Sequence, residues 1–183
     1  MRSFVSWVHS LAYVVKGAHC MRQGDDEGVI RNYSRAIEIS PEDLDYYYAR
    51  GHAYWHKREL GMAIADFSTA IDLNPDDLYA HFVRGAIYPE KGYLAQAIMD
   101  LNFVIEISDG PALAYFLRAK CFAEKKNFEK AMEDLERALE EDPYMAKARK
   151  LKAECEQEMV KAGTFDLLAT TDQKESRGGA GFF

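Results

Sequence analysis

The sequence has few cysteines and few prolines, and it lacks a long apolar run. Its three cysteines, Cys20, Cys121 and Cys155, are odd in number and far apart. No pair has the C-x-x-C spacing of a zinc knuckle or a redox motif, so we expect small buried thiols in a reducing compartment. No stretch approaches the ~20 apolar residues that a membrane-spanning helix needs. With only five prolines in 183 residues, the chain can bury an apolar core.

A basic surplus is also missing. The formal net charge is −7, whereas proteins that bind a nucleic-acid backbone usually carry excess positive charge. We therefore expect no nucleic-acid partner. The chain is predicted to be cytoplasmic. An export signal is the alternative, because Phe4, Val5, Trp7, Val8 and Leu11 follow Met1-Arg2, although serines and His9 dilute that run.

Motifs that carry catalysis are absent as well. The sequence contains no glycine-rich phosphate loop and no nucleophile elbow. His52 and His56 share a helix face, but the residues between them lack the Glu of the HExxH motif and a third ligand is not evident. We expect no enzyme activity, no metal and no cofactor.

What the sequence does contain is a 34-residue period. Gly17, Gly51 and Gly85 are 34 residues apart, and Ala119 takes the next step. Two further slots hold small residues at Val29, Ala63, Ala97 and Ala131, and at Ala36, Ala70, Val104 and Ala138. Apolar residues within each period fall at helical spacing. This pattern predicts paired helices that approach closely at the small residues and stack to bury their apolar faces.

The slots resemble the tetratricopeptide-repeat family, whose pattern alternates aromatic and small residues and ends in proline. The second frame matches best, with Tyr47, Gly51, Tyr54, Ala63, Phe67, Ala70 and Pro75. The resemblance implies an all-α, right-handed superhelical solenoid of four helical hairpins at residues 10–43, 44–77, 78–111 and 112–145. Residues 1–9 would extend the first helix.

A charged pair recurs on the same period. Arg50, Arg84 and Arg118 each precede an aspartate by sixteen residues, whereas the first frame has Lys16 and Asn32. The three aspartates are Asp66, Asp100 and Asp134. We expect structural Arg–Asp bridges between the two helices, because a pair that is repeated in this way favours a structural role over a functional one.

The two ends of the chain differ from the repeats. Residues 146–162 form an amphipathic capping helix, with Ala148, Leu151, Cys155 and Met159 along one stripe. Residues 163–183 are expected to be a flexible tail with apolar Phe165, Leu167, Leu168, Phe182 and Phe183. At the other end, Phe4, Val8, Leu11, Val15 and Ala18 form an apolar stripe.

The resemblance further implies that the first helix of each hairpin lines a concave groove, and that in the third frame this helix runs through Pro89 and Glu90. The candidate partner-binding residues in the groove are Tyr48, His52, Trp55, His56, Tyr79, Phe82, Phe116 and Lys120. Large rings are common binding anchors, so an apolar or amphipathic peptide segment is the expected ligand. The alternative for each ring is a place in the core between repeats.

The clamp that some family members use for carboxy-terminal carboxylates of chaperones is missing. Its five positions hold Val14, Ala18, Ala49, Tyr79 and Val83, none of which can pair with a carboxylate. The sequence therefore predicts a protein–protein interaction scaffold or adaptor without that clamp. The alternative is a structural module that self-associates, as a homo-oligomer, through its apolar N-terminal end and its tail.

Overall fold

The structure is a computed structural model that describes the backbone of residues 2–163 and the side chains of residues 10–163. These described residues form α-helices and one short 3-10 helix, with no strand among them. The all-α fold predicted from the sequence is therefore confirmed. The chain divides into two compact units, unit 1 at residues 1–109 and unit 2 at residues 110–183.

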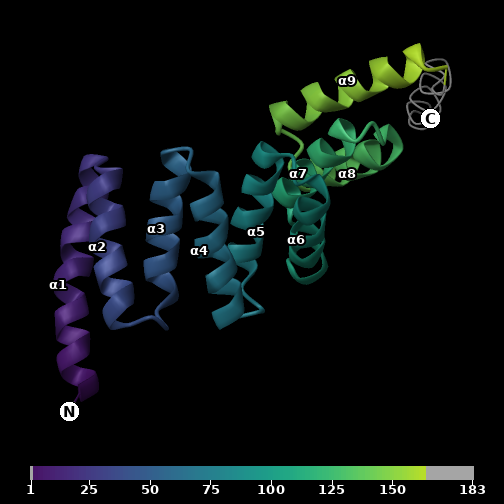
Figure 1. Ribbon diagram of the computed structural model, residues 1–183. Helices are drawn as coiled ribbons and strands as arrows, with labels where there is room; N and C mark the ends of the chain where they lie inside the picture. Colours follow the sequence, from purple (N-terminus) through teal and green to yellow (C-terminus); the bar gives the residue numbers. More distant parts are fainter. Residues whose placement is uncertain (1, 164–183) are drawn as a thin grey trace, which may run out of the picture. The chain divides into compact units, whose positions relative to one another are not determined.

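Unit 1 is a row of helices in which each α-helix packs against the next one in the chain (Figure 1). A 3-10 helix, η1, directly follows the fifth α-helix. The bounds are α1 Arg2–Gln23, α2 Asp26–Ile39, α3 Leu44–His56, α4 Leu60–Leu73, α5 Leu78–Ile87, η1 Tyr88–Lys91 and α6 Leu94–Ile107.

Unit 2 contains α7 Ala112–Glu124, α8 Phe128–Glu141 and α9 Ala146–Lys161. Helix α9 packs mainly against α8 (Figure 1). Its buried residues are Ala148, Cys155 and Met159, which lie on the stripe identified in the sequence. Polar residues occupy its exposed side, so α9 covers the apolar surface of α8 and presents a polar face to solvent.

Small residues lie where paired helices cross. Ala63, Ala97 and Ala131 are fully buried, and Val29 is almost so. The periodic glycines have a related cause. A Cβ on Gly51 would lie 3.0 Å from Cε2 of Phe67, and one on Gly85 would lie 3.1 Å from Cγ of Leu101. The glycines therefore let a large side chain of the second helix lie directly against the first helix.

The turn inside each hairpin uses a left-handed residue, again on the 34-residue period. Gly24, Arg58, Gly92 and Lys126 have φ angles of 70°, 64°, 76° and 59°. Glycine adopts this conformation without steric cost, whereas Arg and Lys do not. The turn geometry is therefore the same in all four hairpins, although only two of them have the residue that suits it.

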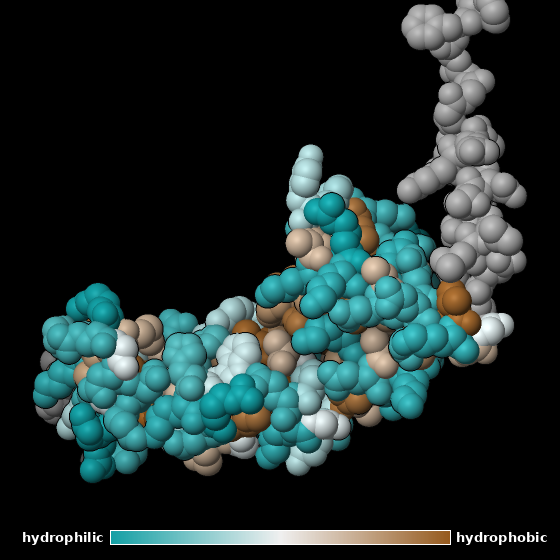
Figure 2. All heavy atoms as spheres, turned by 90° about the horizontal axis from the view of Figure 1, so that it is seen from above, coloured by the Kyte–Doolittle hydropathy of each residue, from teal (hydrophilic) through white to brown (hydrophobic). Residues whose placement is uncertain are grey.

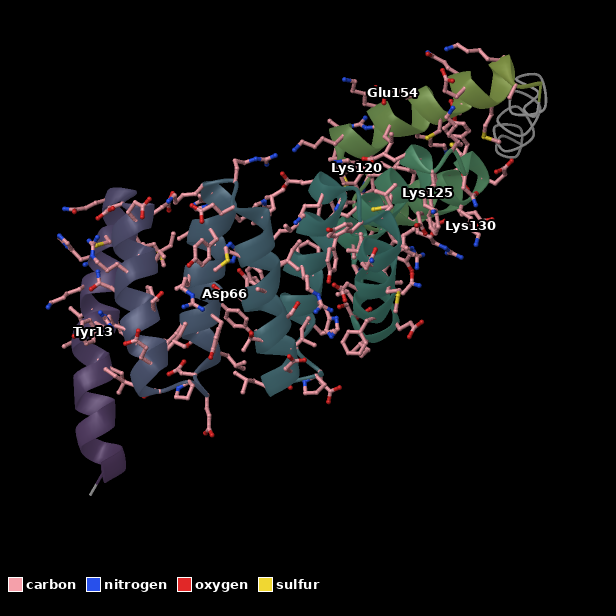
Figure 3. All side chains as sticks on the ribbon, viewed as in Figure 1. Tyr13, Asp66, Lys120, Lys125, Lys130 and Glu154 are labelled. Atoms are coloured by element: carbon pink, nitrogen blue, oxygen red, sulfur yellow. The ribbon has the colours of Figure 1, made fainter. Side chains whose placement is uncertain are left out.

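The predicted Arg–Asp bridges are confirmed, and each one has two hydrogen bonds. Nε and Nη2 of Arg50 donate to the carboxylate of Asp66 at 2.9 and 2.7 Å. Figure 3 shows Asp66 between α3 and α4. Arg84 binds Asp100 at 2.8 and 2.8 Å, and Arg118 binds Asp134 at 2.8 and 2.6 Å. The paired helices of the second, third and fourth hairpins are thus each joined by a bidentate ion pair.

Arg50 and Arg84 also bind the preceding repeat, a contact that the sequence did not predict. Nη1 of Arg50 donates to Oγ of Ser34 at 3.0 Å, and Nη1 of Arg84 donates to Oγ of Ser68 at 2.9 Å. Each of these arginines therefore connects three helices, two of its own repeat and one of the repeat before it.

The third repeat departs from the prediction that its first helix runs through Pro89 and Glu90. Helix α5 ends at Ile87, and Pro89 lies in η1. Proline has no amide hydrogen to donate to the carbonyl four residues earlier, so the α-helical hydrogen bonding stops here. Because of this change, Glu90 lies at the end of a tighter turn and not on a regular α-helix.

Candidate functional site

Five of the eight candidate residues share packing contacts on two helices of unit 1, Tyr48, His52 and Trp55 on α3 and Tyr79 and Phe82 on α5. We refer to these five residues as the aromatic face. The Tyr48 and Tyr79 rings meet edge to face, with centroids 5.2 Å apart and an interplanar angle of 77°. His52 lies 5.9 Å from the Tyr79 ring and 6.1 Å from the Trp55 ring. The rings of Tyr48, His52, Trp55 and Tyr79, although distant in sequence, thus form one continuous group, and Phe82 packs against the core cluster below it.

The core of unit 1 supports the aromatic face from below. The Phe67 ring of α4 is fully buried, and it lies 6.2 Å from the Tyr48 ring and 5.2 Å from the His52 ring. Tyr48, Trp55 and Phe82 are half-buried against the same core cluster. The rings are therefore held by packing, which limits their freedom before any ligand binds.

Most polar atoms of these rings are hydrogen-bonded within the protein. The Tyr48 hydroxyl donates to the carboxylate of Asp77, which also caps α5 by accepting from the Ala80 amide at 3.0 Å. Nε1 of Trp55 donates to Oε1 of Glu90 at 2.7 Å. Nε2 of His52 lies 2.5 Å from the Tyr79 hydroxyl. The exposed surface of the group consequently consists mainly of ring carbons.

The aromatic face carries no charge of its own near neutral pH. Burial lowers the pKa of His52 below its usual value, and the neighbouring His56 lowers it further, so the His52 imidazole is neutral at pH 7. Burial and the nearby Asp77 raise the pKa of the Tyr79 hydroxyl. A neutral aromatic surface favours apolar contacts, and the carboxylates of Asp77 and Glu90, which accept hydrogen bonds from Tyr48 and Trp55, are fixed charges next to it.

The exposed fraction of each ring decides whether a ligand can reach it. Tyr79 is 47% exposed, while Val83, one turn along α5, is only 4% exposed. Hydrophilic residues cover most of the side of the molecule seen in Figure 2, where apolar atoms appear only in small separate spots. Tyr79 is thus the most accessible ring of the aromatic face.

The other three candidates, His56, Phe116 and Lys120, lie outside this group of rings. His56 is exposed at the end of α3, where Nδ1 lies 3.3 Å from Oδ1 of Asp26. Phe116 belongs to unit 2, is 8% exposed and is part of the core there, which is the alternative that the sequence left open. Lys120 is exposed on α7 of unit 2 (Figure 3). The structure therefore brings together only the five residues of the aromatic face.

No metal site is formed by the residues that the structure describes, since no three His, Cys, Asp or Glu side chains among them are close enough to hold an ion. The Cys121 and Cys155 thiols are buried and unpaired, and Cys20 is a half-buried free thiol. Of the helices in the described part of the chain, none is both long enough and apolar enough to cross a bilayer.

The predicted self-association surfaces fall largely outside the described residues. The side chains of residues 1–9, which include Phe4 and Val8, are not described, and neither are residues 164–183. Of the N-terminal stripe, Leu11 and Val15 are exposed, at 41% and 60%.

Comparison with known families identifies the repeat. A family model described as TPR repeat matches residues 17–57, and two described as tetratricopeptide repeat match residues 44–77 and 112–145. Together these matches cover more than half of the chain. This chain belongs to the tetratricopeptide-repeat family, whose members are in general non-enzymatic modules for protein–protein interaction. A search of curated protein sequences finds no match.

Solved structures share the fold. MamA from Desulfovibrio magneticus RS-1 has a TM-score of 0.79 at 20% identity, over 94% of this chain and 97% of that one. YrrB, described as a TPR protein with an unusual peptide-binding site, has a TM-score of 0.74 at 25% identity, over 79% of this chain and 74% of its own. The first TPR of Spaghetti (RPAP3), bound to the HSP90 peptide SRMEEVD, has a TM-score of 0.62 at 21% identity, over 64% and 93%.

Proposed function

We propose that this protein is a scaffold that binds an apolar or amphipathic peptide segment of a partner protein on its aromatic face. The observation that carries the proposal is the accessible Tyr79 ring, which packs on Tyr48 and His52 while the polar tips of these rings are bonded internally. A ligand meets mainly ring carbons here, because the Tyr48 and Tyr79 hydroxyls and Nε2 of His52 already have partners within the protein.

The packing of the aromatic face on the core of unit 1 favours the binding of a ligand. Tyr48 and His52 rest on the buried Phe67 ring, so little side-chain entropy is lost when a ligand covers them. Half-exposed aromatic residues on a rigid base are typical anchors for binding. An amphipathic helix is a suitable ligand, because its apolar residues recur at spacings of three and four along one side.

The comparisons support a peptide as the class of ligand. YrrB is described as having an unusual peptide-binding site, and the Spaghetti repeat binds an HSP90 peptide that contains two glutamates. Here the positions of the chaperone carboxylate clamp hold no cation. Tyr79 occupies one of them, and Val83, which occupies another, is buried. An apolar segment therefore suits this chain better than an acidic carboxy-terminal tail.

The test starts from a random peptide library displayed on phage and selected against the full chain. Peptides that are enriched should carry apolar residues three and four positions apart. Their affinity is then measured by fluorescence anisotropy for the unaltered protein and for the Tyr79→Ala variant. Loss of this anchor should weaken binding about tenfold, or roughly 1.4 kcal/mol.

The matched control is Tyr144→Ala, which removes a tyrosine that is 86% exposed in unit 2. This change should leave the affinity as it was, and both variants should keep their melting temperature. The proposal is wrong if the selected peptides bind the Tyr79→Ala protein as tightly as the unaltered one.

A further inference from the structure

A second surface of unit 1 has the opposite chemistry to the aromatic face. A hollow of about 510 Å³ lies against α1 and α2, lined by Val15, Lys16, His19, Cys20, Arg22, Arg31 and Asn32. Three of its side chains are permanent cations and none is an acid. This local excess of positive charge is found on a protein whose net charge is −7.

The cations of this hollow are not neutralised by the rest of the described chain. No carboxylate within residues 10–163 lies within 4.0 Å of Lys16, Arg22 or Arg31. Lys16 lies over the ring of Tyr13, with Nζ 5.7 Å from its centroid, and Figure 3 shows Tyr13 on α1. Helix α1 itself contains no acidic residue.

The acidic residues at the start of α2 and along it have partners other than Lys16, Arg22 and Arg31. Asp25 caps α2 by accepting from the Gly28 amide at 2.9 Å, and Asp26 faces His56. Glu27 pairs with Lys57 and Glu38 with Arg35. These four carboxylates lie at or on α2, and none of them forms an ion pair with Lys16, Arg22 or Arg31, although Asp25 lies near Cys20.

A comparison between repeats locates the source of this charge. Lys16 occupies the position of Arg50 and Arg84, which have Asp66 and Asp100 as partners. In the first repeat Asn32 takes the place of the aspartate, and its Nδ2 donates to the Gly28 carbonyl at 2.7 Å. The bridge that neutralises the cation in the later repeats is therefore missing at Lys16.

We infer that the hollow on α1 and α2 is a second binding site, which takes an acidic segment of a partner protein. The segment has carboxylates that pair with Lys16, Arg22 and Arg31 and an apolar side chain that contacts Val15 and Cys20 between them. Charge complementarity selects the partner, and the apolar lining favours a peptide over a free anion. This site is independent of the aromatic face.

The test uses the full chain and a fluorescein-labelled twelve-residue peptide made of four Glu-Glu-Leu units, with binding followed by anisotropy. The Arg22→Glu/Arg31→Glu variant reverses the charge of the hollow. It should bind this peptide at least about tenfold more weakly and should gain affinity for the corresponding Lys-Lys-Leu peptide. High salt should weaken both interactions.

The matched control is Lys125→Glu/Lys147→Glu, which makes the same change in net charge at two exposed lysines of unit 2. Circular dichroism confirms that both variants fold. Unchanged affinity in the control supports the inference. An equal loss in both variants would overturn it, since the effect would then come from net charge alone.

Two other outcomes would also overturn the inference. Tighter binding of a single-stranded oligothymidylate than of the peptide would make the site one for nucleic acid. An affinity that rises about tenfold when residues 164–183 are deleted would make the tail of this chain the occupant.

Discussion

At the scale of single residues, the periodic arginine of the second, third and fourth repeats has a bonded partner for its charge within the fold. Arg50 binds the Asp66 carboxylate through two nitrogens and Ser34 through the third, and its guanidinium lies 5.8 Å from the Tyr47 ring centroid. Guanidinium suits this position because its planar fork matches a carboxylate and its face stacks on a ring. A lysine could not make all of these contacts at once.

The Asp66→Ala substitution tests the cost of removing one partner. The side chain of Arg50 is only 18% exposed, so the loss should lower the free energy of unfolding by about 3 kcal/mol. The double variant Arg50→Met/Asp66→Leu should recover most of that loss, because no charge is then buried alone. Urea unfolding followed by circular dichroism measures both values. A double variant as unstable as Asp66→Ala would show that the ion pair itself stabilises the fold.

The cysteines differ sharply in their surroundings. Burial raises the pKa of the Cys121 thiol to about 11 and also raises the pKa of Cys155. Thiolate is the reactive form, so both should be inert in the folded protein. Iodoacetamide at about pH 8 should add one group per chain, at the half-buried Cys20. Intact mass spectrometry counts the adducts, and the Cys20→Ser protein should show none until denaturant is added.

At the scale of elements, the turns of the four hairpins share one backbone conformation, although different residue types adopt it. Gly24 and Gly92 satisfy the left-handed position at no steric cost, whereas Arg58 and Lys126 adopt it under strain. The amides after these residues close the turn. Asn127, for example, donates to the Phe122 carbonyl at 2.9 Å. The backbone hydrogen bonds therefore hold a conformation that two of the side chains disfavour.

Lys126→Gly should therefore raise the free energy of unfolding by about 0.5–1 kcal/mol, as relief of strain outweighs the greater freedom of glycine in the unfolded chain. Its neighbour Lys125 has a φ of −78° and provides the control. Lys125→Gly relieves no strain and should be neutral or destabilising. Thermal melts of the two single variants decide the matter, and equal shifts would show that the turn is not strained.

The sequence predicted those features of the hairpins whose side chains recur every 34 residues. The glycine and alanine slots and the Arg–Asp bridges follow from volume and charge at fixed positions. The left-handed turns were missed because only two of the four residues are glycine. The serine partners were missed because Asn102 takes the corresponding position one period later. Pro89 does indicate that the α-helix ends near it, but the 34-residue alignment placed Pro89 within the helix.

The candidate site was predictable only in part, for a related reason. Tyr48, Phe82 and Phe116 occupy the same position in successive periods, yet Phe116 is buried in the core of unit 2. The period determines which side of a helix a residue lies on. How much of it stays exposed depends on the neighbouring helices, and one repeat of the sequence does not contain that information.

At the scale of the whole molecule, each unit buries its apolar surface through contacts between neighbouring helices. In unit 2 the last helix, α9, covers α8 with Ala148, Cys155 and Met159. Stability in such an array is close to a sum of repeat and interface contributions. Damage to the α8–α9 interface should therefore expose the apolar side of α8.

Cys155→Glu places a carboxylate in that interface, where the side chain is 2% exposed. Burying the charge without a partner should cost about 3 kcal/mol or more, so α9 should detach and the melting temperature should fall. Light scattering should also show association through the exposed surface of α8. Gln157→Glu adds the same charge on the exposed side of α9 and should change neither property. A Cys155→Glu protein that melts like its parent would contradict the assigned packing.

The hydrogen bonds from Arg50 and Arg84 to a serine of the preceding repeat have a consequence for how such a chain can grow. Residues 44–77 contain both a donor, Arg50, and an acceptor for the following repeat, Ser68. A duplicated copy of this segment, inserted after Asp77, would meet Ser68 with its own arginine and would present its own serine to Arg84. Gene duplication in whole periods can therefore lengthen the array while each new junction keeps this Arg–Ser hydrogen bond.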